Sequence, residues 1–226
     1  MVKSRGNRDY LKMYMLALLF VLLAKSPLQA QSWVKDFTPE TYIGLHGGAS
    51  LVNIDLSPGR DFNQKIGYMG GISFLHISEE YFGGLLIEIH YTQMGWDEFF
   101  ENEQKYVRNL EYISIPMFWQ PYFGKKYRIF ATAGPEIAFL LSDDTVMDVN
   151  EGTSAYYYEK PIQNGFDFGF TGGVGLSGNF GPHKISLEAR YYVGLTSLFE
   201  RSLENNFDSA KNRAISFLMS YHIRLK

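Results

Sequence analysis

Charged and histidine side chains recur in this sequence at a spacing of two residues. Glu88 and His90 form one such pair, and Glu188 and Arg190 form another. Because side chains alternate between the two faces of a β-strand, residues two apart share a face. The set that falls on one parity in this way is Glu88, His90, Arg128, Glu136, Glu188, Arg190, His222 and Arg224.

Two kinds of chemistry are open to this polar set. Opposite charges removed from water must pair, so the set could form an ion-pair network that fills a closed interior. Alternatively, Glu88, His90 and Glu136 could form a relay for protons or ions. The network is favoured, because charges inside a narrow β-barrel generally fill space.

Two further groups of residues could bind something outside the barrel. Acidic residues crowd two expected loops, where they could hold calcium, but their spacing does not match an EF-hand loop. A solvated charged loop is therefore favoured. The run Tyr156, Tyr157 and Tyr158 could contact a partner protein, pack over the barrel mouth or lie at the membrane boundary.

Enzyme motifs and cofactor fingerprints are absent from the sequence. It contains no G-x-S-x-G nucleophile motif, P-loop, dinucleotide fingerprint, HExxH or zinc-ligand spacing. The chain has no cysteine, which excludes disulfides and thiolate chemistry, and a net charge of −3 gives no sign of nucleic-acid binding. We expect no catalytic residue, no metal site, no cofactor and no nucleic-acid partner.

The elements that position the polar set are strands with one apolar and one polar face. In 185–195, one parity reads Ile, Leu, Ala, Tyr, Val, Leu and the other reads Ser, Glu, Arg, Tyr, Gly. This period of two predicts strands. The expected strands are 41–53, 66–77, 82–95, 108–120, 127–142, 164–179, 184–198 and 212–225.

These strands predict an all-β fold, a closed antiparallel transmembrane barrel of eight strands with the up-and-down topology of OmpA/OmpX-type barrels. Glycines share the polar face with long Glu and Arg side chains, as expected inside a narrow tube. That argues against a soluble lipocalin-like barrel with the apolar face inside. Aromatic residues make up 16% of the chain, which fits girdles at two membrane boundaries. Pro116 and Pro135 predict a bulge or kink where they interrupt neighbouring strands.

The connections between the expected strands alternate between long and short. Outer-membrane barrels place short turns on the periplasmic side and longer loops outside. The first thirty residues combine a basic start with an apolar run, Met13 to Ala24, and predict a signal peptide cut near Ala30. The expected organisation is a signal peptide at 1–30, a periplasmic segment at 31–40 and a barrel at 41–226 in the Gram-negative outer membrane.

Three segments have a familiar pattern, namely 83–95 (GGLLIEIHYTQMG), 110–116 (LEYISIP) and 133–136 (AGPE). They resemble segments of PorT-like outer-membrane β-barrel proteins of the Bacteroidetes group. The resemblance covers about 41–226 and implies an eight-stranded barrel with a role in protein secretion. Many bacterial barrels end in an aromatic residue that the insertion machinery reads, whereas this chain ends in Leu225-Lys226.

The expected function is that of a non-catalytic structural or accessory protein that acts through its loops and rim. Its expected partners are outer-membrane lipid and envelope proteins such as secretion components. The alternatives are a lipid-modifying or proteolytic barrel enzyme, which would need His90, Glu88 and a loop serine in contact, and a barrel that binds a small ligand or an ion.

Overall fold

Nine strands account for the regular structure in the part of the chain that the computed structural model describes. The described residues are 38–57, 64–78, 83–99, 105–148, 162–199 and 209–225. The strands are β1 (Glu40–Ser57), β2 (Lys65–Ser78), β3 (Gly83–Phe99), β4 (Lys105–Gln120), β5 (Tyr122–Gly124), β6 (Tyr127–Asp148), β7 (Phe166–Phe180), β8 (His183–Gly194) and β9 (Ser209–Arg224). No helix among the described residues is long and apolar enough to cross a membrane.

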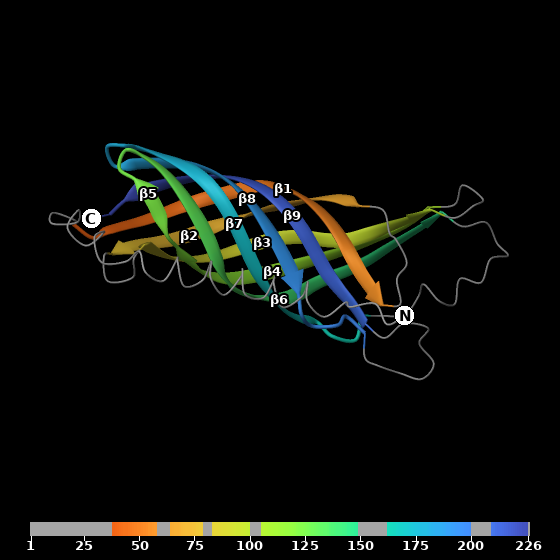
Figure 1. The fold of residues 1–226 in the computed structure, drawn as a ribbon. Coiled ribbons are helices and arrows are strands. Elements are labelled where there is room, and N and C mark those ends of the chain that lie inside the picture. The colour runs from red at the N-terminus through yellow and green to blue at the C-terminus, as the bar shows by residue number, and fades with distance from the viewer. Residues whose placement is uncertain are drawn as a thin grey trace, which may run out of the picture. The chain divides into compact units, whose positions relative to one another are not determined.

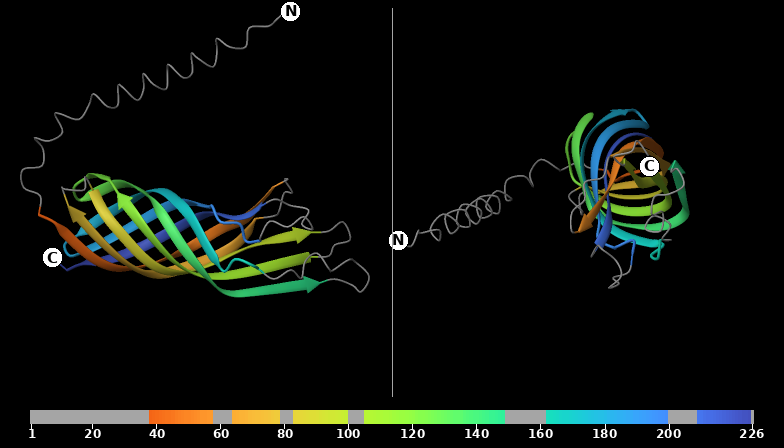
Figure 2. Two further views of the ribbon diagram at one scale, coloured as in Figure 1. Left: turned by 90° about the horizontal axis from the view of Figure 1, so that it is seen from below. Right: turned by 90° about the vertical axis from the view of Figure 1, so that its right-hand side faces the viewer.

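The strands form one antiparallel sheet that closes on itself. The sheet order is β4-β3-β2-β1-β9-β8-β7-β6-β5, and β4 also pairs with β6. β5 prolongs β4 beyond Pro121, which lacks an N–H group, and pairs with the first part of β6. When β4 and β5 are counted as one strand, the closed ring has eight strands, which we also call staves. The expectation of an eight-stranded up-and-down barrel is confirmed. Figure 2 shows the ring along its axis in the right-hand view.

The two faces of the sheet differ as the alternation predicts. Outward positions carry large exposed apolar side chains, such as Leu45 (63% exposed) and Phe217 (60% exposed). Inward positions carry buried polar side chains, such as Glu88 (2% exposed) and Arg190 (4% exposed). A soluble barrel would bury its apolar side chains in the interior, but here they lie on the outside. An apolar outer wall is typical of a barrel that is surrounded by membrane hydrocarbon.

The two prolines interrupt the strand pairing without changing its register. Between β3 and β4, pairing lapses between Ile87↔Met117 and His90↔Ser114, beside Pro116. Between β4 and β6 it lapses between Pro116↔Glu136 and Trp119↔Ala133, beside Pro135. The register shift on β4 and β6 lies elsewhere, between Glu111 and Tyr112. The irregularity expected at the prolines is thus a gap in the ladder rather than a bulge.

Several strand ends differ from their predicted positions. β3, β4 and β6 run further than predicted and project past the neighbouring strands at the end opposite the 125–126 turn (Figure 1). β8 stops at Gly194, although the prediction continued to 198. Beyond Gly194 the regular ladder with β9 ends, although the Leu198 N–H still donates to the Ala210 carbonyl at 2.8 Å. The signal peptide predicted at 1–30 lies outside the described residues.

Candidate functional site

One arginine bridges the centre of the barrel interior. Arg190 on β8 donates two hydrogen bonds to Glu88 on β3, from Nη1 to Oε2 at 2.6 Å and from Nη2 to Oε1 at 2.9 Å. In the closed ring, β3 and β8 are four staves apart in either direction. The ion pair therefore joins opposite walls of the barrel and crosses the interior.

Further contacts hold this bridge in place. The Nη2 group of Arg190 also donates to Glu188 Oε2 at 2.9 Å, and Thr132 Oγ1 donates to the other oxygen of Glu188. The guanidinium lies 4.7 Å from the ring centroid of Phe118. Two carboxylates and one ring thus constrain a single buried arginine, which is the arrangement that makes a buried charge tolerable.

Two histidines lie beside Glu88. His46 Nε2 is 3.8 Å from Glu88 Oε2, and His90 Nδ1 is 3.7 Å from the same oxygen. The His90 Nε2 atom faces Glu136 Oε1 at 3.5 Å, and Glu136 accepts a 2.7 Å hydrogen bond from Thr171 Oγ1. Both histidines are buried, and none of their ring nitrogens has a hydrogen-bond partner among the described residues. We call Glu88, Glu136, Glu188, Arg190, His46 and His90 the central charge layer.

The structure separates Arg128 and Arg224 from this layer, although the sequence analysis placed all eight residues in one network. Arg128 donates to Glu40, from Nη1 to Oε2 at 2.8 Å and from Nη2 to Oε1 at 3.1 Å, and Arg224 contacts the same carboxylate. Glu40 also accepts a hydrogen bond from the Tyr42 hydroxyl at 2.9 Å. β1 and β6 are again four staves apart, so this second ion pair also crosses the interior.

Sequence reasoning missed Glu40 as a functional residue. Position 40 ends the expected periplasmic segment 31–40, whereas β1 starts at Glu40, and the residue is 8% exposed. The signal that could have found it is its parity, because Glu40 and Tyr42 continue the inward series that contains His46.

His222 belongs to neither ion-pair group. Its Nε2 atom shares a 2.9 Å hydrogen bond with Ser73 Oγ, and its Nδ1 atom has no partner among the described residues. A serine and a histidine are therefore paired without the acid that would orient the imidazole in a catalytic triad. Both side chains are buried, so the pair is not exposed to a substrate at the rim.

The far end of the interior is apolar, which the sequence analysis did not predict. Leu198 and Phe199, which follow β8, are buried against inward residues of the strands. Arg108 pairs with Asp143 (Nε–Oδ1, 2.8 Å) and lies 5.6 Å from the Trp96 ring centroid. We call the following set the outer apolar cluster: Val52, Ile54, Met94, Trp96, Leu110, Tyr112, Ala138, Tyr192, Leu198, Phe199, Ala210 and Ala214.

A polar contact also crosses the interior at this end. Asn212 Nδ2 donates to Asp167 Oδ2 at 2.8 Å and to the Tyr112 hydroxyl at 3.4 Å. β9 and β4 are four staves apart, so Asn212 and Tyr112 belong to opposite walls. Side chains thus meet across the interior at three positions between its two ends.

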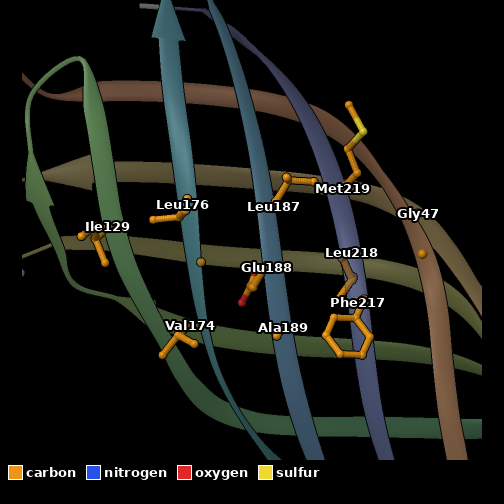
Figure 3. A pocket seen from close by; sticks show the side chains of 12 residues that line it. Gly47, Ile129, Val174, Leu176, Leu187, Glu188, Ala189, Phe217, Leu218 and Met219 are labelled. Carbon is orange, nitrogen blue, oxygen red and sulfur yellow. The ribbon is translucent and has the colours of Figure 1, made fainter.

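The described part of the structure has a small cavity inside the barrel and a hollow on its outer wall. An internal cavity of about 20 Å³ lies beside His90, Glu136, Thr171 and Arg190, which is room for one water-sized species. A shallow apolar hollow of about 620 Å³ lies on the outer wall, between β6, β7, β8, β9 and β1 (Figure 3). Leu176, Leu187 and Phe217 line it, so this hollow opens towards hydrocarbon and not towards the interior.

The loop residues singled out by the sequence lie mostly outside the described residues. This applies to Tyr156, Tyr157 and Tyr158 and to the acidic residues Glu101, Glu103 and Glu151. The other acidic residues expected in these loops lie in strands instead, Asp97 and Glu98 in β3 and Asp143, Asp144 and Asp148 in β6. The possible partner role of the tyrosines stays an untested alternative, and so does the less favoured calcium role of the acidic residues.

Residues 29–200 match the model of a family described as the outer membrane protein beta-barrel domain. This span is most of the chain, and it includes β1 to β8. The chain belongs to this family. The barrel domain therefore resides in the outer membrane of a Gram-negative cell, where its apolar wall contacts lipid.

Solved structures of other proteins have a related shape at low identity. Neisserial surface protein A is 12% identical with a TM-score of 0.43, and the match covers 81% of this chain and 98% of that one. OprG from Pseudomonas aeruginosa is 10% identical with a TM-score of 0.43, over 82% and 96%. Ail, the attachment invasion locus protein of Yersinia pestis, solved with the heparin analogue sucrose octasulfate, is 12% identical with a TM-score of 0.40, over 82% and 99%. No curated protein sequence matches the barrel domain.

Proposed function

We propose that this protein is a non-conducting, non-catalytic structural or accessory barrel that acts through its rim. The observation that carries the proposal is the ion pair between Glu88 and Arg190, which joins opposite walls at the centre of the interior. Among the described residues, the outer apolar cluster at one end and the pair of Arg128 with Glu40 nearer the other also occupy the interior, which supports a barrel that is closed to solutes. Interaction surfaces are then left to the loops and turns.

Planar-bilayer recording tests the absence of conduction. The refolded protein should give no unitary conductance steps, whereas a large porin reconstituted in the same way should give them. Reproducible steps from the wild-type protein would contradict the proposal. If those steps vanished in Glu136→Gln, they would instead support the relay through Glu88, His90 and Glu136.

The link to protein secretion rests on the resemblance of segments 83–95, 110–116 and 133–136 to PorT-like barrels. We propose that the barrel is an accessory component of an outer-membrane secretion system. Affinity purification from outer membranes in mild detergent tests this, with identification of the proteins that co-purify. Stoichiometric secretion components would support the link. Recovery of the barrel alone, under conditions that keep a known secretion complex intact, would overturn it.

The proposal of no catalysis rests on the location of the histidines. His46, His90 and His222 are buried in the interior, and the serine that contacts one of them belongs to a pair without an acid. The exposed His183, which begins β8, shares a 2.7 Å hydrogen bond with the Tyr221 hydroxyl, and His76 shares one of 3.0 Å with Thr41 Oγ1. Hydrolysis of lipid ester or peptide substrates by the refolded wild-type protein, lost in Ser73→Ala, would contradict it.

A further inference from the structure

The inward face of β1 and β3 brings together two imidazoles and a carboxylate whose ligand atoms converge. One ligand atom from each of His46, Glu88 and His90 lies within 4.8 Å of the others. The two imidazole rings are perpendicular, with their centroids 5.4 Å apart, and both direct a nitrogen at Glu88 Oε2. We propose that these three residues bind one divalent transition-metal ion of the Zn²⁺ type.

In the described part of the chain, the ring nitrogens of both histidines are unused as hydrogen-bonding groups. Both histidines are buried, at 6% and 2% exposed, yet none of their ring nitrogens has a hydrogen-bond partner among the described residues. Buried polar atoms in proteins are nearly always satisfied, and each exception needs a reason. A metal ion supplies that reason for the two nitrogens that face Glu88, His46 Nε2 and His90 Nδ1.

The spacing of the ligand atoms also fits a metal ion. Ligand atoms at 2.0–2.1 Å from a tetrahedral zinc are about 3.3 Å from one another. The nitrogens lie 3.8 Å and 3.7 Å from Glu88 Oε2, so small side-chain shifts close the site. A carboxylate has enough lone pairs to serve both a metal and a guanidinium, so the pairing of Glu88 with Arg190 does not compete with ligation.

The outer nitrogen of His90 faces a carboxylate. Metal-bound histidines almost always donate their second ring N–H to a carboxylate, a carbonyl or water. When Nδ1 of His90 binds the metal, its Nε2–H points at Glu136 Oε1, 3.5 Å away. Thr171 holds that carboxylate through a 2.7 Å hydrogen bond. Glu136 is thus a positioning residue for the proposed site.

The charge of the surrounding layer also favours a cation. The central charge layer contains three carboxylates, from Glu88, Glu136 and Glu188, and a single guanidinium, from Arg190. With neutral imidazoles, the layer itself has two more negative than positive charges, and the nearest further cation is the buried Lys184, four residues from Glu188 on β8. A divalent cation balances the two excess negative charges.

Two imidazoles and one carboxylate suit a borderline metal better than calcium or magnesium, which prefer all-oxygen ligands. The three protein ligands leave a fourth tetrahedral position, which a water molecule would take. Because the interior is filled, the ion would enter during folding. The test therefore adds metal during refolding and not afterwards.

The experiment compares four proteins without a histidine tag, namely wild type, His46→Gln, His90→Gln and His222→Gln. Each is refolded into detergent with zinc, passed through a desalting column with a mild chelator, and analysed by mass spectrometry for bound zinc. His222→Gln is the matched control, because His222 is a buried interior histidine outside the group. We expect about one zinc per chain in wild type and His222→Gln, and almost none in the other two. Absence of zinc from the wild type, or equal loss in His222→Gln, would overturn the site.

Refolding with Co²⁺ gives a readout that does not depend on the variants folding. The wild-type protein should show the visible absorption of four-coordinate cobalt with nitrogen ligands. The spectrum of hexaaqua cobalt would overturn the ligand set. For Glu136→Gln, we expect an unchanged zinc stoichiometry at saturation and an affinity lower by about 10- to 100-fold, with recovery in Glu136→Asp. An unchanged affinity in Glu136→Gln would remove the positioning role of Glu136.

Discussion

The parity of a residue in a strand predicts which face of the barrel wall it occupies, but not which residue it contacts. The period of two is enough to place Glu88 and Glu188 on the inward face, and both are buried there. It does not identify partners, because Arg190 could reach any inward carboxylate of its own or a facing strand. The partner depends on how far along the barrel axis the residues of β3 lie relative to those of β8. That offset is the sum of the strand registers between them.

Removing the central arginine should destabilise the barrel strongly. In Arg190→Ala, Glu88 and Glu188 lose the guanidinium that both contact, and each remains buried. We expect the free energy of unfolding to fall by about 3–5 kcal/mol, the usual cost of an unpaired buried charge. Denaturant unfolding in detergent micelles measures it.

The matched control is Arg213→Ala. Arg213 forms an ion pair with Asp55, but its side chain is 47% exposed. An exposed pair contributes about 0–1 kcal/mol, so this variant should be nearly as stable as the wild type. Equal losses in Arg190→Ala and Arg213→Ala would mean that the central bridge has no special role.

At the scale of the strands, alternation predicted the number of staves and the pattern of long and short connections. The ends were less predictable. Asp97 resembles a loop residue, yet β3 continues to Phe99, because Trp96 turns inward and packs under Arg108. The predicted strand 184–198 ran past Gly194, where Leu195 continues the outward apolar parity, but β8 ends at Gly194 and Leu198 packs into the outer apolar cluster.

Strand β7 provides a test of close packing inside the tube. A Cβ atom added at Gly169 would lie 2.4 Å from Tyr192 Cε2, whereas one added at Gly172 would meet nothing nearer than the Thr132 carbonyl at 4.0 Å. We expect Gly169→Val to lower the free energy of unfolding by about 1–3 kcal/mol, as overpacking does. The effect of Gly172→Val should stay within about 0.5 kcal/mol.

Denaturant unfolding of both variants measures the difference. A loss in Gly172→Val as large as that in Gly169→Val would point to β-strand backbone effects and would contradict the close packing of the Tyr192 ring on Gly169.

For the whole molecule, the outer apolar cluster is the main feature that the sequence did not reveal. Its members within the strands lie on the inward parity, where polar groups were expected, and the other two, Leu198 and Phe199, follow the end of β8. No local pattern indicates that residues from a connection will cover the mouth of a barrel. The interior therefore has a charged centre and an apolar end. Apolar packing at that end fills the tube together with the ion pairs.

The partition of side chains between membrane and interior can be measured directly, because the chain contains no cysteine of its own. Single cysteines at Leu176, Leu187 and Phe217 on the outer wall, and at Ser186, Ser216 and Ser220 on the inner wall, can carry nitroxide labels. Power saturation in lipid bilayers then compares collisions with oxygen, which enters hydrocarbon, and with a water-soluble nickel chelate. We predict strong oxygen collisions and weak nickel collisions for the three outer labels, and weak collisions with both for the three inner labels. Strong oxygen collisions at the serine positions, with protected labels at Leu176, Leu187 and Phe217, would contradict the account.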